Sequence, residues 1–376
     1  MAGLYIHIPF CRTRCIYCDF CSSTLGDDAQ ARYADALCNE MDARRDYCHT
    51  RRMETLYIGG GTPSLLNDTL LERILCHARR VFDFPVDAEV TVEANPDDIN
   101  PARMRRWKEV LGINRLSMGV QSFQEAELRW MNRRHTGRQA REAVRSAYEA
   151  GLENISIDLI YGLPGSDIHS WSDTLRQALA LPVCHLSAYC LSVEPRTPLG
   201  KMCATKKTVL PDEEVSEAQY RLLVEATSKA GFVHYEISNF ARPTYHARHN
   251  AAYWDGTPYL GLGAGAHSFD GHTRRANTDN VQTYINADGH PPFTTETLSD
   301  SERANETVFT ALRTAKGLDL RRFRKQFGDD ALRYILQQAA RHLATHRLVR
   351  EGDTLRLSKE GVFVSDSIVA DLMDVD

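Results

Sequence analysis

The 376-residue sequence contains no run of roughly 18 to 20 apolar residues, which is the length that a membrane-spanning helix needs. Its first residues, MAGLYIHIPFCRTRC, also lack the basic start and the apolar stretch of a signal peptide. Charge of one sign is not in excess, because 45 Lys and Arg face 50 Asp and Glu, a formal net charge of -5. This balance argues against a nucleic-acid coat or a membrane-surface protein. We therefore expect a globular, cytoplasmic protein.

The cysteines divide into a cluster and a scattered set. Disulfides are rare in the reducing cytoplasm, so the ten cysteines do not predict a disulfide framework. Six of them are spread along the chain, as packing cysteines usually are, but the other four fall between positions 11 and 21. This cluster requires an explanation of its own.

The first two hundred residues alternate short apolar or β-branched runs with amphipathic helical stretches. Helical patterns cover, for example, residues 102–110 and 138–150. Such alternation predicts an α/β fold in which helices cover a parallel sheet, and periodicity alone leaves open whether this sheet is open or a complete or partial barrel. The predicted strands are residues 4–8, 55–58, 89–93, 115–120, 154–160 and 184–191.

The remainder of the chain is organised differently. Residues 213–230 predict one long helix, whereas the Gly-rich residues 259–267 show neither a helical nor a strand pattern and indicate closely packed backbone. Near the end, a further amphipathic helix precedes a hairpin at 348–357, which suggests a small winged-helix-like helical domain. We expect three parts, residues 1–200, a connecting region 201–295, and the C-terminal domain 296–376.

Cys11, Cys15 and Cys18 form a C-x3-C-x2-C motif directly after the first predicted strand. Three thiolates on one short loop can bind three irons at adjacent corners of an iron–sulfur cluster. Such a cluster is usually held by four cysteines, so three leave one iron open to an exchangeable ligand. The alternatives are a zinc knuckle or buried thiols. Zinc sites usually include a second, distant ligand pair, and no such pair stands out here.

The segment Tyr5-Ile-His-Ile-Pro-Phe-Cys11, the cysteine spacing and the aromatic before the third cysteine resemble the radical S-adenosylmethionine superfamily. The resemblance is to its branch of anaerobic coproporphyrinogen dehydrogenases and related heme chaperones, and later motifs follow in the same order. It implies a partial (β/α)6 barrel. It also implies a [4Fe-4S] cluster held by the three cysteines, with S-adenosylmethionine bound to the fourth iron.

Several positions match the residues that contact S-adenosylmethionine in this superfamily. Taken alone, a Gly-Gly-Gly-Thr-Pro turn or a strand-end carboxylate is commonplace. The resemblance assigns contacts to the methionine amino group, the carboxylate, the ribose and the surroundings of the cluster, and charged or amide groups suit these partners. The residues implied are Tyr5, Tyr17, Gly60, Gly61, Thr62, Glu93, Gln121, Arg133 and Asp158, with Arg134 as an alternative to Arg133.

The sequence departs from the dehydrogenase pattern in two places. Dehydrogenases have a further cysteine two residues beyond the third, where this chain has Phe20, and Cys21 is offset by one residue. They also carry a longer segment ahead of the cysteine strand. Both departures favour the chaperone-like pattern over radical decarboxylation of coproporphyrinogen III. A radical enzyme with another substrate is a third possibility.

The motif His249-Asn-Ala-Ala-Tyr-Trp254 offers a tentative heme ligand. Imidazole is a common axial ligand of heme iron, and the two aromatic residues could pack on a porphyrin. The resemblance ties this motif to heme binding in the chaperones, while the plain alternative is a core histidine beside aromatic residues. His267 is the second candidate. We thus expect a heme chaperone that binds heme, a [4Fe-4S] cluster and S-adenosylmethionine and transfers heme to an acceptor protein.

The C-terminal domain does not have the charge of a DNA-binding module. Between Asp300 and Asp376, thirteen Lys and Arg face thirteen Asp and Glu. A winged helix that reads DNA is expected to be basic on one face. We therefore predict no nucleic-acid partner, and a lid or a surface for docking a partner instead.

Overall fold

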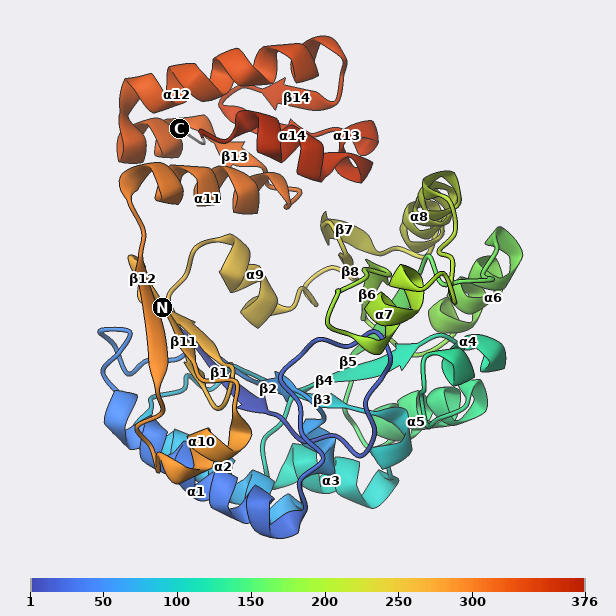
Figure 1. Cartoon of the computed structure of the whole chain (residues 1–376), viewed down its shortest axis with the longest axis vertical. Coiled ribbons are helices and arrows are strands. Elements are labelled where there is room, and N and C mark those ends of the chain that lie inside the picture. The colour runs from blue at the N-terminus through green and yellow to red at the C-terminus, as the bar shows by residue number, and fades with distance from the viewer. Residues whose placement is uncertain (1, 375–376) are drawn as a thin grey trace.

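The computed structural model describes residues 2–374, and its central feature is a curved sheet of parallel strands (Figure 1). Neighbouring strands in the chain are neighbours in the sheet, which is the arrangement of the partial barrel that the resemblance implies. These strands are β1 (Gly3–Ile8), β2 (Thr55–Gly60), β3 (Glu89–Ala94), β4 (Arg115–Gln121), β5 (Asn154–Tyr161) and β6 (His185–Cys190).

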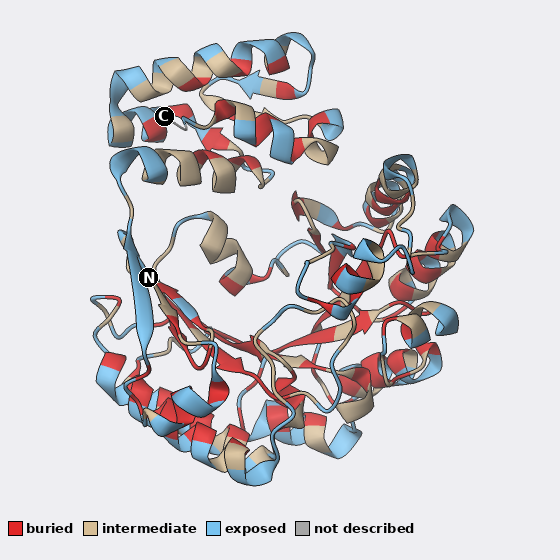
Figure 2. Cartoon of the chain, in the orientation of Figure 1, coloured by how far each residue is buried: buried red, intermediate tan, exposed pale blue. Residues whose placement is uncertain are grey.

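Helices cover the convex face of this sheet (Figures 1 and 2). Their starts follow local rules. Helix α3, for example, is capped by Asn100, whose side chain accepts a hydrogen bond from the backbone of Arg103, and Pro101 occupies the first turn. The helices are α1 (Asp27–Arg44), α2 (Asp68–Val81), α3 (Pro101–Glu109), α4 (Glu125–Trp130), α5 (Gly137–Glu149) and α6 (Ile168–Leu179).

The two faces of the sheet differ in polarity. Side chains alternate between the faces of a strand, and Ile58, Val92 and Leu116 belong to the hydrophobic core. Glu93 and Ser117, which alternate with them, line a cavity instead. The concave face is therefore polar, and functional groups are carried inside the curve of the sheet.

Strands from the second half of the chain extend the same sheet at both edges, to twelve strands in the described part of the chain. β9 runs parallel to β1, and β8 runs antiparallel to β6. No pairing between the outermost strands, β12 and β7, closes a barrel within residues 2–374. The added elements are α7 (Pro198–Ala204), α8 (Glu213–Lys229), β7 (Val233–Glu236), β8 (Asn239–Ala241), α9 (Arg248–Trp254), β9 (Tyr259–Leu262), β10 (His267–Phe269), β11 (Thr273–Asn277), α10 (Val281–Asn286) and β12 (Phe293–Thr297).

The expectation that residues 259–267 lack strand structure is wrong. Residues Tyr259–Leu262 form β9, a buried strand between β1 and β10. A Cβ atom on Gly261 would lie 1.9 Å from the carbonyl oxygen of His267, so only glycine fits there. The glycines that hide the strand pattern are the ones that the close packing requires. The domain boundaries near residues 200 and 295 stay a prediction.

The C-terminal region has its own core around Leu312, Phe323 and Leu355, and it confirms the predicted helical domain with a hairpin. It is joined to the sheet by backbone hydrogen bonds from Ile237 to Arg313 and from Ala315 to Tyr235. Its elements are α11 (Asp300–Leu312), β13 (Leu318–Asp319), α12 (Leu320–Ala344), β14 (Leu348–Glu351), β15 (Thr354–Leu357), α13 (Lys359–Phe363) and α14 (Ser365–Leu372). None of the helices in residues 2–374 is long and apolar enough to cross a membrane.

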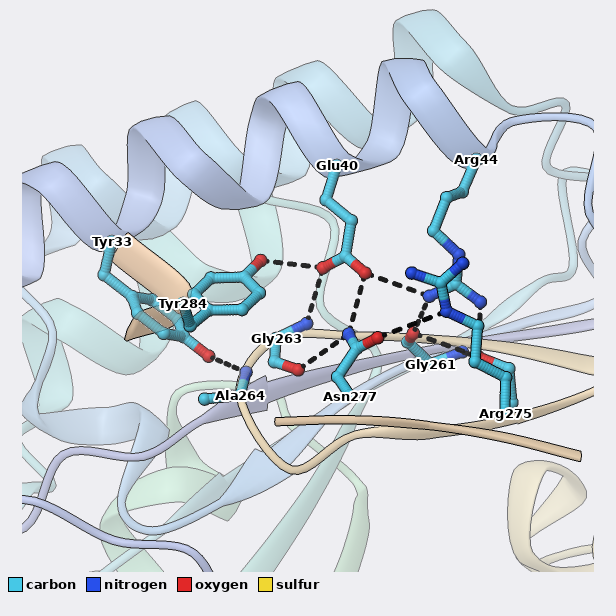
Figure 3. Close-up of polar contacts among 10 residues, drawn as sticks. Tyr33, Glu40, Arg44, Gly261, Gly263, Ala264, Arg275, Asn277 and Tyr284 are labelled. Atoms are coloured by element: carbon cyan, nitrogen blue, oxygen red, sulfur yellow. Dashed lines mark hydrogen bonds and ion pairs between the residues drawn. The ribbon is translucent and has the colours of Figure 1, made fainter. Parts of the chain in front are cut away.

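A buried carboxylate attaches the added strands to α1 (Figure 3). The Glu40 side chain is fully buried, and its oxygens accept hydrogen bonds from Arg44 Nη1, Asn277 Nδ2, the Gly263 amide and the Tyr284 hydroxyl at 2.7 to 2.9 Å. These donors come from two helices, the glycine turn after β9, and β11. One side chain on α1 thus binds the turn after β9, the end of β11 and helix α10.

We expect Glu40→Gln to lower the free energy of unfolding by about 3 kcal/mol, because it leaves the buried guanidinium of Arg44 without its charge partner. The matched control is Glu217→Gln, which removes the more exposed i,i+4 ion pair with Arg221 and should cost less than about 0.5 kcal/mol. Urea denaturation of both variants measures the difference. Equal losses would contradict a central role for Glu40.

Candidate cofactor site

A cavity of about 410 Å³ lies at the carboxyl ends of the parallel strands. In parallel α/β folds this is the edge at which strand ends and the following loops converge on a ligand. The cavity is lined by the three clustered cysteines and by most of the residues implied for S-adenosylmethionine. Those residues are Tyr17, Gly60, Gly61, Thr62, Glu93, Gln121, Arg133 and Asp158.

The cysteine loop begins after β1, and its end returns to the residues that directly follow this strand. Cys11 N donates to Ser23 O, and Ser23 N donates to Pro9 O. Thr62 Oγ1 lies 3.5 Å from Cys11 Sγ, and Arg133 Nη1 lies 3.4 Å from Cys15 Sγ. A Cβ on Gly61 would lie 3.0 Å from the Cys11 sulfur, so a side chain there would crowd it. The glycine turn and the arginine therefore face the sulfurs directly.

All ten cysteines are free thiols, and Cys21 is directed away from the cavity, with its sulfur 3.1 Å from the carbonyl oxygen of Asp279. Within residues 2–374, no three ligating side chains converge on a single point. A [4Fe-4S] cluster binds each thiolate to a different iron, so its three sulfurs surround a volume instead of meeting at one ion. Three thiols spaced around one cavity fit the cluster.

Glu93 and Asp158 place two half-buried carboxyl groups on the cavity wall. Glu93 accepts hydrogen bonds from Tyr57 OH at 2.6 Å and from the Gly60 amide at 3.0 Å, and burial raises its pKa to about 7. Burial also raises the pKa of Asp158. Gly60 has a φ of 112°, and a Cβ there would collide with the His7 ring, so this turn requires glycine. The carboxyl groups are held ready for a cationic or hydroxyl-bearing ligand.

The structure distinguishes the two adjacent arginines. Arg133 lines the cavity and donates hydrogen bonds to Asn95 Oδ1 at 2.7 Å and to the Gly119 carbonyl, besides its contact with Cys15. Arg134 forms an ion pair with Asp97 at 2.6 Å. Both arginines line the cavity, but Arg133 is the one that contacts the cysteine loop. Its contact with S-adenosylmethionine stays a prediction.

Gln121 ends β4 in an uncommon conformation. Its φ of 66° lies in the left-handed region, and the β4–β5 register shifts between Gly119 and Gln121. Such a conformation costs of order 1–3 kcal/mol in a residue other than glycine and is concentrated at functional sites. The irregularity occurs at the cavity edge.

Tyr5 and His249 do not line this cavity. Tyr5 OH lies 2.9 Å from His7 Nδ1, and its ring stacks on Tyr57 and His249 with centroids 6.1 and 6.3 Å apart. These rings occupy the polar concave side of the sheet. Tyr5 therefore reaches the cavity only through Tyr57, whose hydroxyl donates to Glu93.

Both ring nitrogens of His249 have partners. Nδ1 lies 2.7 Å from Thr55 Oγ1, Nε2 lies 2.9 Å from Tyr253 OH, and the residue is 2% exposed. Burial lowers the pKa of His249 to about 3, so the ring is neutral. Thr55 begins β2, so His249 lies at the amino ends of the strands, opposite the cysteines. His267, the second candidate, is exposed on β10.

Asn95 and Tyr189 also line the cavity and were not among the predicted residues. Asn95 joins the two halves of the site, because it accepts from Arg133 and donates to Thr62 Oγ1. Both residues stand at the carboxyl end of a predicted strand, which is the signal that could have identified them.

Two family models match the chain: the radical SAM superfamily at residues 5–178 and the HemN C-terminal domain at residues 298–364. The heme chaperone HemW of Bacillus subtilis (strain 168) is 33% identical over 373 residues, or 98% of each chain. HemW of Escherichia coli (strain K12) is 39% identical over 270 residues, covering 70% of this chain and 69% of the relative. The chain belongs to the HemW family. Membership of the radical SAM superfamily implies the [4Fe-4S] cluster and S-adenosylmethionine, as predicted.

Among solved structures, coproporphyrinogen III oxidase (HemN) from Escherichia coli, a radical SAM enzyme, superposes with a TM-score of 0.86 over 99% of this chain and 90% of that one. The two sequences are 24% identical, so the likeness shows a common fold. It confirms the predicted α/β radical SAM architecture. This chain thus shares its fold with that oxidase.

We expect anaerobically reconstituted protein to bind about four irons per chain, and Ala at Cys11, Cys15 or Cys18 to abolish the cluster. The measurement is iron content together with the sulfide-to-iron absorption band. Cys21→Ala is the matched control, because its sulfur is bound to the Asp279 carbonyl instead of lining the cavity. Full iron in Cys15→Ala would refute the ligand set, and equal loss in Cys21→Ala would show that the set is the wrong one.

Proposed function

We propose that this protein is a cytoplasmic heme chaperone, which binds heme and passes it to an acceptor protein. The observation that carries the proposal is a cavity lined by Cys11, Cys15 and Cys18 in a chain whose Bacillus subtilis relative, matched over 98% of both chains, is named a heme chaperone. No helix among residues 2–374 is long and apolar enough to span a membrane. The proposal is compatible with an acceptor protein that is itself bound to a membrane.

In this proposal the three cysteines hold the [4Fe-4S] cluster, and S-adenosylmethionine occupies the rest of the cavity. Together these groups supply one-electron chemistry when bound. The glycine turn Gly60–Gly61 leaves backbone groups accessible to the methionine end, while Glu93 and Asp158 offer acceptors to an ammonium group or to ribose hydroxyls. Arg133 and Gln121 provide donors for a carboxylate. Each of these residues lines the cavity.

Phe20 separates this proposal from coproporphyrinogen decarboxylation. Its side chain lines the cavity and is 66% exposed. The dehydrogenase pattern has a cysteine at this position, and a phenyl ring offers neither a thiol nor a hydrogen-bonding group. In the proposed function, the protein therefore binds heme and does not decarboxylate a porphyrinogen.

We expect the reconstituted protein, given reductant and S-adenosylmethionine, to leave coproporphyrinogen III undecarboxylated. The assay follows protoporphyrinogen IX, with an active dehydrogenase as the positive control. Turnover by this protein would favour the decarboxylase instead. Phe20→Cys tests whether that single position is sufficient to restore activity, and we expect that it is not.

Heme ligation by His249 requires the Tyr253 hydroxyl to leave Nε2, because the other ring nitrogen is held by Thr55. If His249 is the axial ligand, His249→Ala should weaken heme binding roughly a hundredfold, or ~2.7 kcal/mol. Tyr253→Phe keeps the aromatic ring but frees Nε2, so heme affinity should be maintained or increased. Heme titration by Soret absorbance measures both variants.

A histidine that only supports the core gives a different pattern. Thermal unfolding of apo His249→Ala would then show a lower melting temperature, and the folded fraction would bind heme with unchanged affinity. His267→Ala is the comparison at the second candidate. Because His267 is exposed, we expect this substitution to leave the melting temperature unchanged. Heme loss confined to His267→Ala would move the ligand to β10.

A further inference from the structure

Asn95 lies directly after β3, and its side chain connects the surroundings of two cysteines of the cluster motif. On one side, Asn95 Nδ2 donates to Thr62 Oγ1 at 3.3 Å, and Thr62 Oγ1 donates to Cys11 Sγ at 3.5 Å. On the other side, Asn95 Oδ1 accepts from Arg133 Nη2 at 2.7 Å, and Arg133 Nη1 donates to Cys15 Sγ at 3.4 Å. A continuous series of hydrogen bonds thus runs from one sulfur to the other.

The backbone of Asn95 is held independently of its side chain. Its amide N–H donates to Ser64 Oγ at 3.2 Å, and its carbonyl oxygen accepts from Asp98 N at 3.0 Å. Asparagine commonly caps a helix with its side chain, and Asn95 precedes the short 3-10 helix η2 (Pro96–Asp98). Within residues 2–374, however, its side chain makes no cap hydrogen bond. The side-chain amide therefore serves the cofactor site and not the local turn.

The direction of the hydrogen bonds in this series is fixed by the arginine. A guanidinium group only donates hydrogen bonds, so the amide oxygen of Asn95 must face Arg133 and the amide nitrogen must face Thr62. Because Thr62 Oγ1 accepts from Asn95, its own hydroxyl proton is directed to the Cys11 sulfur. A carboxylate in place of the amide would accept that proton and withdraw it from the sulfur. Only the amide supplies a donor and an acceptor at once.

Hydrogen bonds to the cysteine sulfurs help to set the reduction potential of an iron–sulfur cluster. A reduced cluster carries one more negative charge than an oxidised one, so donors at its sulfurs stabilise the reduced form and raise the potential. Thr62 is buried, so water competes little for its hydroxyl group. The carbonyl of Gly119 also accepts from Arg133, which helps to hold the guanidinium beside Cys15.

We propose that Asn95 is a positioning residue for the [4Fe-4S] cluster. Its amide directs the hydroxyl of Thr62 to Cys11 and the guanidinium of Arg133 to Cys15, and these two contacts raise the reduction potential of the cluster. The proposal rests on the three cysteines as cluster ligands, and it holds whether or not the protein transfers heme.

The test measures the midpoint potential of the anaerobically reconstituted full chain, by redox titration followed by electron paramagnetic resonance. Asn95→Leu keeps the size of the side chain without its hydrogen bonds, and we expect it to lower the equilibrium constant for one-electron reduction about tenfold, or about 59 mV. Asn95→Asp keeps the shape, accepts the Thr62 proton and should lower the potential at least as far. Asn114→Leu is the matched control and should leave the potential unchanged, because Asn114 binds the backbone of Val90 and Ala88 at the opposite ends of the strands.

Two further variants show whether Asn95 acts through Thr62. Thr62→Val removes the donor to Cys11 and should lower the potential, whereas Thr62→Ser keeps the hydroxyl and should not. When Asn95→Leu and Thr62→Val are combined, the shift should be smaller than the sum of the two single shifts, because the contact with Cys11 can be lost only once. Fully additive shifts, or an unchanged potential in Asn95→Leu, would overturn the proposal.

Iron content and thermal unfolding are measured for every variant. If Asn95→Leu fails to hold the cluster, the isosteric Asn95→Asp and the two Thr62 variants decide, and potentials equal to that of the wild type in Asn95→Asp and Thr62→Val overturn the proposal. A wild-type chain that binds no iron would overturn it together with the cysteine ligand set. A failure to transfer heme, with the potentials shifted as expected, would contradict only the proposed function.

Discussion

The carboxylate of Glu40 is the interaction on which the extension of the sheet depends (Figure 3). It is buried and negatively charged beside Arg44, and three further donors from the second half of the chain complete its hydrogen bonds. An isolated buried charge would be very costly, so the carboxylate is stable only when the glycine turn, β11 and α10 are all in place. In this way one residue of α1 makes distant segments fold together, and β9 is held beside β1 as a result.

The fold was largely predictable because strand and helix periods alternate clearly up to residue 200. β9 was not, because Gly261 and Gly263 resemble a loop until the carbonyl of His267 is seen against Gly261 and that of His7 against Gly263. Most of the cavity residues could be predicted because they lie both at strand ends and in recognisable motifs. Asn95 and Tyr189 also lie at strand ends, but no motif singles them out. The partners of His249 were beyond reach, since the Thr55 hydroxyl is far away in the sequence and only the fold brings it to Nδ1.

The concave side of the sheet joins two sites that the sequence keeps apart. His249 lies at the amino ends of the strands, and the cysteine loop follows their carboxyl ends. Between them, Tyr57 stacks on His249 with centroids 5.1 Å apart, and its hydroxyl donates to Glu93 in the cofactor cavity. His249, Tyr57 and Glu93 thus form a continuous series of packed rings and hydrogen bonds. Because the interior is closely packed, a movement of the His249 ring displaces Tyr57 and, through it, Glu93.

The position of β1 also determines when the protein can mature. Leu4 pairs with Leu56 on one side but with Leu260 on the other, and the glycine turn after β9 packs against Cys21 in the cysteine loop. A ribosome adds roughly 5–20 residues per second, so β9 follows β1 by about ten seconds or more. During that interval the loop has neither β9 nor the Asp279 carbonyl to hold it. The contacts that hold Cys21 are therefore completed only after most of the chain has been synthesised.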